Sequence, residues 1–245
     1  MLFAHGFGCD QGMWRFVEPA FRADHRTVLF DHVGAGNADL ASYDPVRYDS
    51  LGQYADDVID ICRGLGLEQV VFVGHSVSAM IGVLAAIKAP QLFSRLVLIC
   101  PSPCYIDDGD YVGGFSRDDI AGLIDFLDDN FVAWSGAMAP TIMGNPERPE
   151  LGQELESSFC RTDPTAARQF ARVTFLSDNR RDLGLLRTPA LILQTADDAI
   201  APPAVGRYLQ QALGGSTLVQ MAARGHCPNL SAPQETVAAI RDYLR

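Results

Sequence analysis

The sequence predicts an α/β fold, built on a mostly parallel sheet with helices on both of its faces. Short apolar runs alternate with helical patterns along the first 100 residues and again after residue 188. Parallel strands require crossover connections of this kind, and the crossovers are almost always right-handed. A chain of 245 residues that is 48% hydrophobic is also long enough to bury one well-filled core. We therefore expect one large domain.

The first part of this core is expected in residues 1–105. Apolar runs and helical patterns alternate here, and glycine or proline separates several of them. Residues 51–65, for example, carry apolar side chains on one face and three aspartates on the other, and Gly66 ends the pattern. The predicted elements are strand 1–4, helix 13–21, strand 27–30, helix 51–65, strand 70–73, helix 79–89 and strand 95–100.

A change of pattern in residues 106–187 predicts a helical lid inserted into the core. This segment contains no convincing strand, but helical stretches occur near 116–130, 131–142, 150–159 and 164–176. The second part of the core is expected in residues 188–245. Its predicted elements are strand 190–194, helix 203–213, strand 216–221 and helix 234–244.

The predicted lid is rich in aromatic residues, and two interpretations of them remain open. They are Phe115, Phe126, Phe131, Trp134, Phe159, Phe170 and Phe175. They could form the core of a separate helical layer. Alternatively, the inner face of the lid lines a hydrophobic cavity above the carboxyl ends of the strands. We expect Phe115, Phe126, Phe131, Trp134, Phe170 and Phe175 to bind substrate, together with Phe7.

Ser76 lies where a nucleophilic serine is expected. The buried strand 70–73 precedes it and the helix 79–89 follows it, so Ser76 falls on a sharp strand-to-helix turn. Strand and helix crowd at such a turn, which therefore needs small flanking residues. Gly74 is the first of these, and Ser78 replaces the second glycine of the usual pattern. Alone, the pattern also fits an ordinary turn.

A base and an acid follow Ser76 in the order that α/β hydrolases use. Serine needs a base with a pKa near 7, oriented by a buried acid. His226 lies in a loop after the last predicted strand, and Asp198 lies in a loop after strand 190–194. Asp197 is the alternative acid. We favour Asp198 because it is the first residue of a D-x-x-x-P arrangement that ends at Pro202, and we expect Asp197 to cap a turn.

The other four histidines are expected to have different roles. Strand alternation should turn His75 away from the side of the serine. We expect His25 and His32, which flank the second strand, at the surface or in turns. His5 is expected to pack beneath the loop that it begins.

Backbone amides are expected to bind the oxyanion that acyl transfer creates. The amide of Val77 directly follows the nucleophile and should supply one donor. The amide of Phe7 should supply the other, because glycines on both sides allow the backbone to turn toward the substrate. The ring of Phe7 would then face the cavity.

Composition argues against several other classes of protein. A net charge of −11 and a pI near 4.7 disfavour nucleic acid and anionic membranes as partners. No metal site or cofactor is expected, since there is no C-x-x-C pair and residues 34–39 lack the third glycine of a dinucleotide motif.

The sequence has no apolar run long enough to span a bilayer and no signal peptide, so we expect a cytoplasmic protein. Six cysteines are expected as buried free thiols: Cys9, Cys62, Cys100, Cys104, Cys160 and Cys227.

Four segments carry a resemblance to a known family. They are residues 5–11 (HGFGCDQ), 74–82 (GHSVSAMIG), 101–105 (PSPCY) and 113–115 (GGF). The chain resembles, over essentially its whole length, the RsbQ family of bacterial stress-response α/β hydrolases and its plant relatives, the karrikin and strigolactone receptors. Residues 224–228 (RGHCP) are closer to the bacterial branch, whereas residues 77–80 (VSAM) are similar to the plant receptors.

The resemblance implies a fold, a site and a function. It implies an α/β-hydrolase fold whose four-helix, V-shaped lid follows the sixth strand of the family fold and covers an apolar pocket. It also implies a triad of Ser76, Asp198 and His226, no cofactor, and slow hydrolysis of small apolar esters or lactones linked to signalling. The alternative is a ligand-gated receptor or regulator that acts through a protein partner, such as the phosphatase of RsbQ-type proteins, with incidental hydrolysis.

The sequence departs from the family at its front end. Family members carry a β-hairpin before the position of Met1. Its absence would leave strand 1–4, an inner strand of the family fold, at or near an edge of the sheet. We therefore expect lower stability or dimerisation relative to a form with the hairpin.

Overall fold

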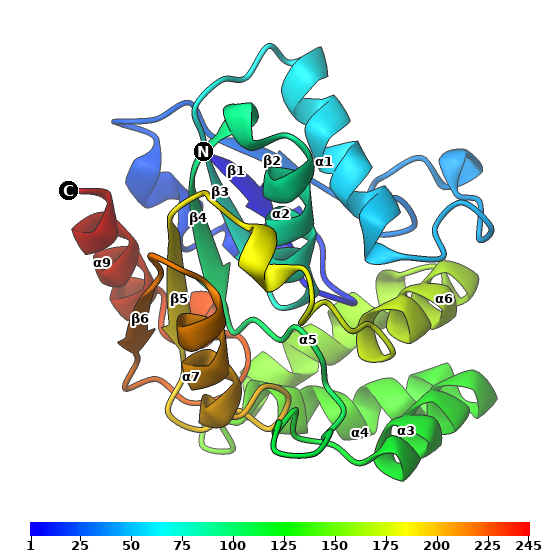
Figure 1. Cartoon of the computed structure of the whole chain (residues 1–245). Coiled ribbons are helices and arrows are strands. Elements are labelled where there is room, and N and C mark those ends of the chain that lie inside the picture. Colours follow the sequence, from blue (N-terminus) through cyan, green and yellow to red (C-terminus); the bar gives the residue numbers. More distant parts are fainter.

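A six-stranded parallel sheet forms the centre of the molecule (Figure 1). The computed structural model describes residues 1–245. In sequence order the strands are β1 (Leu2–Ala4), β2 (Val28–Phe30), β3 (Val70–His75), β4 (Phe93–Ile99), β5 (Ala190–Gln194) and β6 (Thr217–Gln220). Their order in the sheet is β2-β1-β3-β4-β5-β6, and every neighbouring pair is parallel. This arrangement confirms the predicted α/β class. β1 lies next to the edge strand β2.

Alternation along the strands sends side chains into two separate cores. Phe3, Val73 and Val97 belong to a cluster of 33 buried residues on one side of the sheet. Phe72 and Leu96 belong to a second cluster of 31 buried residues on the other side. Both faces of the central strands are therefore covered, which is why these strands read as continuous apolar runs.

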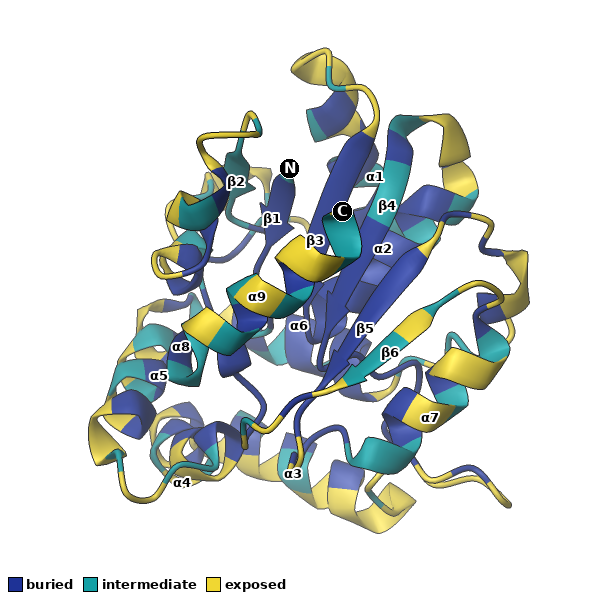
Figure 2. Cartoon of the chain, turned by 90° about the vertical axis from the view of Figure 1, so that its left-hand side faces the viewer, coloured by how far each residue is buried: buried dark blue, intermediate teal, exposed yellow.

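Helices cover the two faces. The core helices are α1 (Leu51–Gly64), α2 (Val77–Lys88), α7 (Pro203–Ala212), the short α8 (Pro228–Ser231) and α9 (Pro233–Leu244). α1 and α2 pack against each other, and side chains of α1, α2 and α7 enter the second cluster. Ile240 of α9 enters the first cluster. Figure 2 shows that α9 is buried along the sheet and exposed on its outer face. No helix combines the length and the apolar character that crossing a membrane requires.

The predicted helix over residues 13–21 is wrong. The structure has two short 3₁₀ helices there, Gln11–Trp14 and Glu18–Phe21. Pro19 lies in the first turn of the second one. Proline cannot donate the backbone hydrogen bond that a continuous helix needs, so the helix is interrupted before it.

Four helices form an insertion between β4 and β5, here called the helical insertion. They are α3 (Arg117–Asp129), α4 (Phe131–Met143), α5 (Pro149–Arg161) and α6 (Pro164–Phe175). Ser116 and Asp119 form a capping box at the start of α3, and Asn130 caps α4. Gly144 ends α4 in the left-handed conformation. The helical insertion lies at the carboxyl ends of the strands, where α/β proteins bind ligands (Figure 1).

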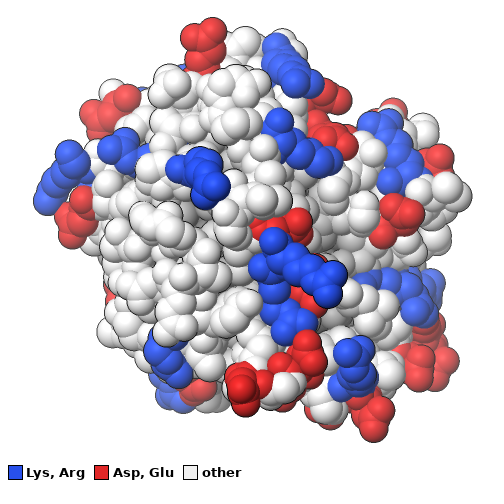
Figure 3. Space-filling model, viewed as in Figure 1, with Lys and Arg blue, Asp and Glu red and all other residues white.

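Charges of both signs are mixed on the surface. Figure 3 shows one face, where Lys and Arg side chains lie beside Asp and Glu without a broad basic area. Arg180, for example, pairs with both Asp108 and Asp178. No disulfide is present, and five of the six cysteines are buried as expected, whereas Cys160 is exposed on α5.

Candidate active site

Ser76 occupies a strained turn between β3 and α2. Its backbone has φ 56° and ψ −123°, a conformation that non-glycine residues rarely adopt. The amide of Ser76 donates to the carbonyl oxygen of Ile99 at 2.8 Å, which anchors the turn to β4. A Cβ atom on Gly74 would lie 2.5 Å from the carbonyl oxygen of Ser78. The turn is therefore as crowded as the sequence predicts, and only glycine fits at position 74.

Ser78 replaces the second glycine of the usual pattern, and its hydroxyl makes two hydrogen bonds. The Ser78 hydroxyl donates to the carbonyl oxygen of His5 at 2.5 Å. It accepts a hydrogen bond from Nε2 of His32 at 2.8 Å. His32 is buried and does not lie at the surface, although it begins a turn, because its carbonyl oxygen accepts from the amide of Ala35 at 2.9 Å. Burial and the neighbouring His5 hold the pKa of His32 well below its usual value.

The structure brings Ser76, His226 and Asp198 together. Nε2 of His226 lies 2.7 Å from the hydroxyl oxygen of Ser76. Nδ1 of the same ring lies 2.8 Å from Oδ2 and 3.0 Å from Oδ1 of Asp198. A carboxylate accepts hydrogen bonds, so Nδ1 carries the proton and Nε2 is free to accept the proton of Ser76. All three side chains are buried.

The carboxylate of Asp198 is held in its charged form. Burial raises its pKa, but His226 and the amides of Ile200 and Ala201 outweigh this effect and leave the pKa below its usual value. The two amides donate to Oδ1 at 2.8 and 3.0 Å. Asp197, the alternative acid, is exposed and pairs with Arg224 at 2.8 Å. The structure therefore places Asp198, and not Asp197, against His226.

The loop that carries His226 is fixed by the helical insertion. The amide of His226 donates to the carbonyl oxygen of Ile142 in α4 at 2.8 Å. Gly225 has φ 79°, and a Cβ atom there would lie 1.7 Å from the carbonyl oxygen of Met143. The last turn of α4 and the histidine loop are thus in direct backbone contact.

Two backbone amides are available to an oxyanion. Neither the Phe7 nor the Val77 amide donates a hydrogen bond to another backbone group in this structure. Nε2 of His5 accepts from the amide of His32 at 3.0 Å, so Nδ1 carries the proton and donates to the carbonyl oxygen of Gly6 at 2.8 Å. The Gly6 carbonyl and the Phe7 amide share one peptide plane and point in opposite directions. The buried ring of His5 therefore turns the Phe7 amide away from itself.

A small apolar cavity lies over the reacting atoms. Its volume is about 30 Å³, enough for a water molecule but not for an ester. Ser76 and His226 line it together with Phe7 and Phe175. The remaining lining residues are Cys9, His75, Ile142, Leu155, Phe159, Thr174, Ile200 and Cys227.

The structure places the other predicted aromatic residues at increasing distance from this cavity. The ring centres of Trp134 and Phe170 lie 5.9 and 6.0 Å from that of Phe7, and Phe131 stacks on Trp134. Phe115 is half-buried and is not a lining residue. Phe126 is 40% exposed and does not line this cavity, and its role in substrate binding stays a prediction.

Two residues that were not expected at the site, Phe159 and His75, also line the cavity. On α5, Leu151, Leu155 and Phe159 recur every four residues and form one buried stripe. This stripe was the signal that could have identified the inner face of α5. His75 does not turn away from the site, because it lines the same cavity as Ser76.

Cys100, Asp198 and His226 come nearest to a metal-binding set. Their ligand atoms lie within 4.8 Å of one another. However, Asp198 and His226 already bond to each other, and burial raises the pKa of the Cys100 thiol well above its usual value. A protonated thiol is a poor ligand. The geometry therefore fits a hydrogen-bonded triad better than a metal centre.

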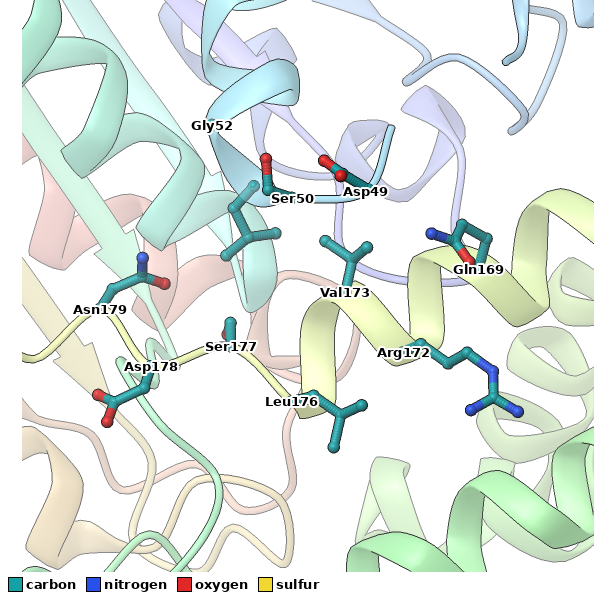
Figure 4. Close-up of a pocket in the computed structure, with 11 residues that line it drawn as sticks. Asp49, Ser50, Gly52, Gln169, Arg172, Val173, Leu176, Ser177, Asp178 and Asn179 are labelled. Carbon is teal, nitrogen blue, oxygen red and sulfur yellow. The ribbon is translucent and has the colours of Figure 1, made fainter. Parts of the chain in front are cut away.

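A larger hollow lies elsewhere on the surface. It has a volume of about 420 Å³ and lies between the start of α1 and the end of α6. Figure 4 shows Asp49 and Ser50 on one side and Val173 and Leu176 on the other. It contains none of the triad residues, so the small cavity is the candidate active site.

Family membership follows from comparison with known proteins. The model described as "Alpha/beta hydrolase family" matches residues 1–240, so the chain belongs to this family. Within it, the buried serine, histidine and aspartate define a serine hydrolase.

Its relatives include a plant strigolactone esterase, a plant karrikin insensitive 2 receptor and a bacterial hydrolase. The chain is 39% identical to a strigolactone esterase of Arabidopsis thaliana and 37% identical to a karrikin insensitive 2 receptor of Petunia hybrida, in each case over 100% of this chain and 91% of the relative. A solved hydrolase from Oleispira antarctica superimposes with a TM-score of 0.97 and 43% identity, covering 99% of this chain and 89% of that one. The resemblance to strigolactone and karrikin receptors is confirmed, whereas the resemblance to RsbQ stays a prediction.

Proposed function

We propose that this protein cleaves small apolar carboxylic esters or lactones through an acyl-serine intermediate. The observation that carries the proposal is the distance of 2.7 Å between the Ser76 hydroxyl and Nε2 of His226, at the floor of an apolar cavity. The relatives named as a strigolactone esterase and a karrikin receptor support the substrate class.

The geometry supports a two-step reaction. The Ser76 oxygen attacks the carbonyl carbon while Nε2 of His226 takes the hydroxyl proton. The amides of Phe7 and Val77 bind the oxyanion, and Asp198 stabilises the imidazolium. Collapse breaks the bond to the alcohol oxygen, which receives the proton from His226. Water then attacks the acyl-serine by the same sequence and releases the acid and Ser76.

The substrate enters only when the helical insertion moves. A cavity of about 30 Å³ is closed to an ester, and α5 and α6 supply part of its wall. In this proposal residues 106–187 act as a lid on a core formed by residues 1–105 and 188–245. Lid opening and product release then limit turnover, which makes hydrolysis slow.

Replacement of the nucleophile tests this proposal. Ser76→Ala should lower kcat for a short-chain p-nitrophenyl ester by at least about 10³-fold, because no oxygen remains to be acylated. Ser157→Ala, an exposed serine of α5, is the matched control and should retain wild-type turnover. Wild-type turnover by Ser76→Ala would show that the serine mechanism is wrong.

A ligand-gated regulator is the second candidate. The backbone contact between α4 and the His226 loop favours it, because a change at the triad reaches the helical insertion directly. In this case a cytoplasmic signalling protein, such as a phosphatase, binds one conformation of the lid and not the other. Mixing with a butenolide probe should then release about one product per protein and leave a lasting adduct in intact mass. Many turnovers without an adduct would instead identify an ordinary esterase.

A further inference from the structure

His75 is a buried residue that the reaction described above does not use. It is the last residue of β3, directly before Ser76, and its side chain is 2% exposed. Its ring centre lies 5.2 Å from that of His226, and both rings line the cavity. Nε2 of His75 lies 2.8 Å from the backbone carbonyl oxygen of His226. The neighbour of the nucleophile thus contacts the main chain of the base.

The hydrogen bond fixes the protonation of His75. A carbonyl oxygen only accepts, so Nε2 carries the proton and donates it. Nδ1 has no hydrogen-bond partner. Burial, reinforced by the neighbouring His226, lowers the pKa of His75 to about 3, and the ring is therefore neutral at neutral pH. The other titratable groups that act on it are Asp198 and His5.

On its other side the ring of His75 contacts the loop that supplies an oxyanion amide. A Cβ atom on Gly6 would lie 2.5 Å from Nδ1 of His75 and 3.3 Å from Cβ of Ser76. Glycine is the residue that fits here without displacing the ring. One rigid imidazole therefore separates the Phe7 loop from the loop of His226.

We propose that His75 is a positioning residue, which holds the main chain of His226 at the distance from Ser76 that proton transfer requires. The inference rests on the proposed serine mechanism. Asp198 orients the ring of His226 through Nδ1, and Ile142 holds its amide. His75 donates a hydrogen bond to the backbone carbonyl oxygen of His226, which the other two contacts leave free. Its neutrality matters as well, because a second positive charge beside His226 would disfavour the imidazolium that forms during the reaction.

Two variants separate positioning from packing. His75→Phe keeps a ring but cannot donate, and should lower kcat by about 10- to 100-fold, the cost of a misplaced catalytic group. Its KM should stay within about 3-fold, because an aromatic ring still lines the cavity at this position. His75→Gln keeps an N–H near the position of Nε2 and should retain kcat within about 5-fold. Rates are expressed per active site, titrated with a serine-directed phosphonate.

Two outcomes would overturn the inference. One is a wild-type kcat per titrated site in His75→Phe, which would leave only a packing role. The other is equal loss in His75→Gln and His75→Phe, since the hydrogen bond would then not be the cause. Ser76→Ala keeps the two proposals apart: its full activity defeats the serine mechanism itself, whatever the His75 variants do.

A measurement on the wild-type protein applies even if His75→Phe does not fold. Nitrogen-15 NMR of labelled histidines should show the His75 ring fixed as the Nε2–H tautomer from about pH 5 to 8, because its pKa of about 3 lies far below this range. The signal is assigned by its loss in His75→Gln. A His75 ring that titrates in this range, or that carries its proton on Nδ1, would contradict the proposed hydrogen bond.

Discussion

Phe7 lies at the centre of the aromatic cluster that limits the size of the cavity. Its ring centre lies about 6 Å from those of four other rings, in Trp134, Phe159, Phe170 and Phe175. The ring of Phe159 also rests on Gly8, where a Cβ atom would lie 1.9 Å from it. These rings come from the first loop and from three helices of the helical insertion, so they join the core to the insertion.

Removing one ring should enlarge the cavity and change the preferred substrate. Phe159→Ala is expected to improve kcat/KM for longer acyl chains relative to short ones by about 10-fold or more, since each accommodated methylene contributes about 1–3 kcal/mol. It should also cost about 3–5 kcal/mol of unfolding free energy. The check is a series of p-nitrophenyl esters together with urea unfolding.

Phe126→Ala is the matched control for this change. Its ring is 40% exposed, so chain-length preference and stability should both stay close to wild type. A change of preference in Phe126→Ala, or none in Phe159→Ala, would show that this cavity does not select the acyl chain.

The positions of the three candidate catalytic residues could be predicted from the sequence, but the residues that line the cavity could not. Ser76, Asp198 and His226 could be located because each follows a strand, and parallel strands end on one edge. The lining of the cavity depends on how each inserted helix is rotated, which tertiary packing decides. Phe126 and Phe159 therefore looked alike in sequence, although one is exposed and the other is buried.

At the scale of elements, the end of α4 and the loop before α8 depend on two glycines. Gly144 and Gly225 both have positive φ angles, and a Cβ atom on Gly144 would lie 2.8 Å from Cα of Gly225. Asn145 of the same turn donates to the carbonyl oxygen of Arg224 at 3.2 Å. The backbones of the α4 end and the histidine loop are therefore in contact, with no room for a side chain between Gly144 and Gly225.

Adding one methyl group should separate these segments. Gly225→Ala combines a clash with the Met143 carbonyl and an unfavourable φ, so it should destabilise the protein by more than about 1 kcal/mol and lower kcat. Gly184→Ala, where nothing lies within 4 Å, is the control. Thermal melting and ester turnover are the measurements. Unchanged values in Gly225→Ala would mean that the contact is not needed.

The order of strands and helices was predictable, whereas one short helical segment was not. Strand β3 and helix α2 follow from apolar runs and helical periodicity. The pattern over residues 13–21 has helical spacing too, but Pro19 divides it. A local backbone restriction outweighed the side-chain pattern there.

At the scale of the whole molecule, four of the five histidines are buried, and three of these four have a lowered pKa. Burial lowers the pKa of His5, His32 and His75. In the unfolded chain each titrates near the ordinary value of about 6.5. Between the two pKa values the unfolded state binds more protons, so acid shifts the equilibrium toward unfolding.

Stability should therefore fall as the pH drops below about 6.5. Between pH 7 and 5.5 the buried His75 ring should remove up to about 1.3 kcal/mol of unfolding free energy, and His5 and His32 act in the same direction. Urea unfolding at the two pH values measures this difference. His75→Gln should reduce this difference by up to about 1.3 kcal/mol. A difference that stays the same in His75→Gln would mean that His75 is not one of the groups responsible.

The contact between α4 and the histidine loop also limits how this family can be recombined. A designer who transfers the helical insertion of a relative, to obtain a new pocket, would naturally cut the chain near residues 106 and 187. The carbonyl oxygen of Ile142 accepts a hydrogen bond from the amide of His226, which lies outside the transferred segment. The α4 helix of one parent would then contact the histidine loop of the other parent. Functional chimeras should therefore keep residues 142–145 and 224–226 from the same parent.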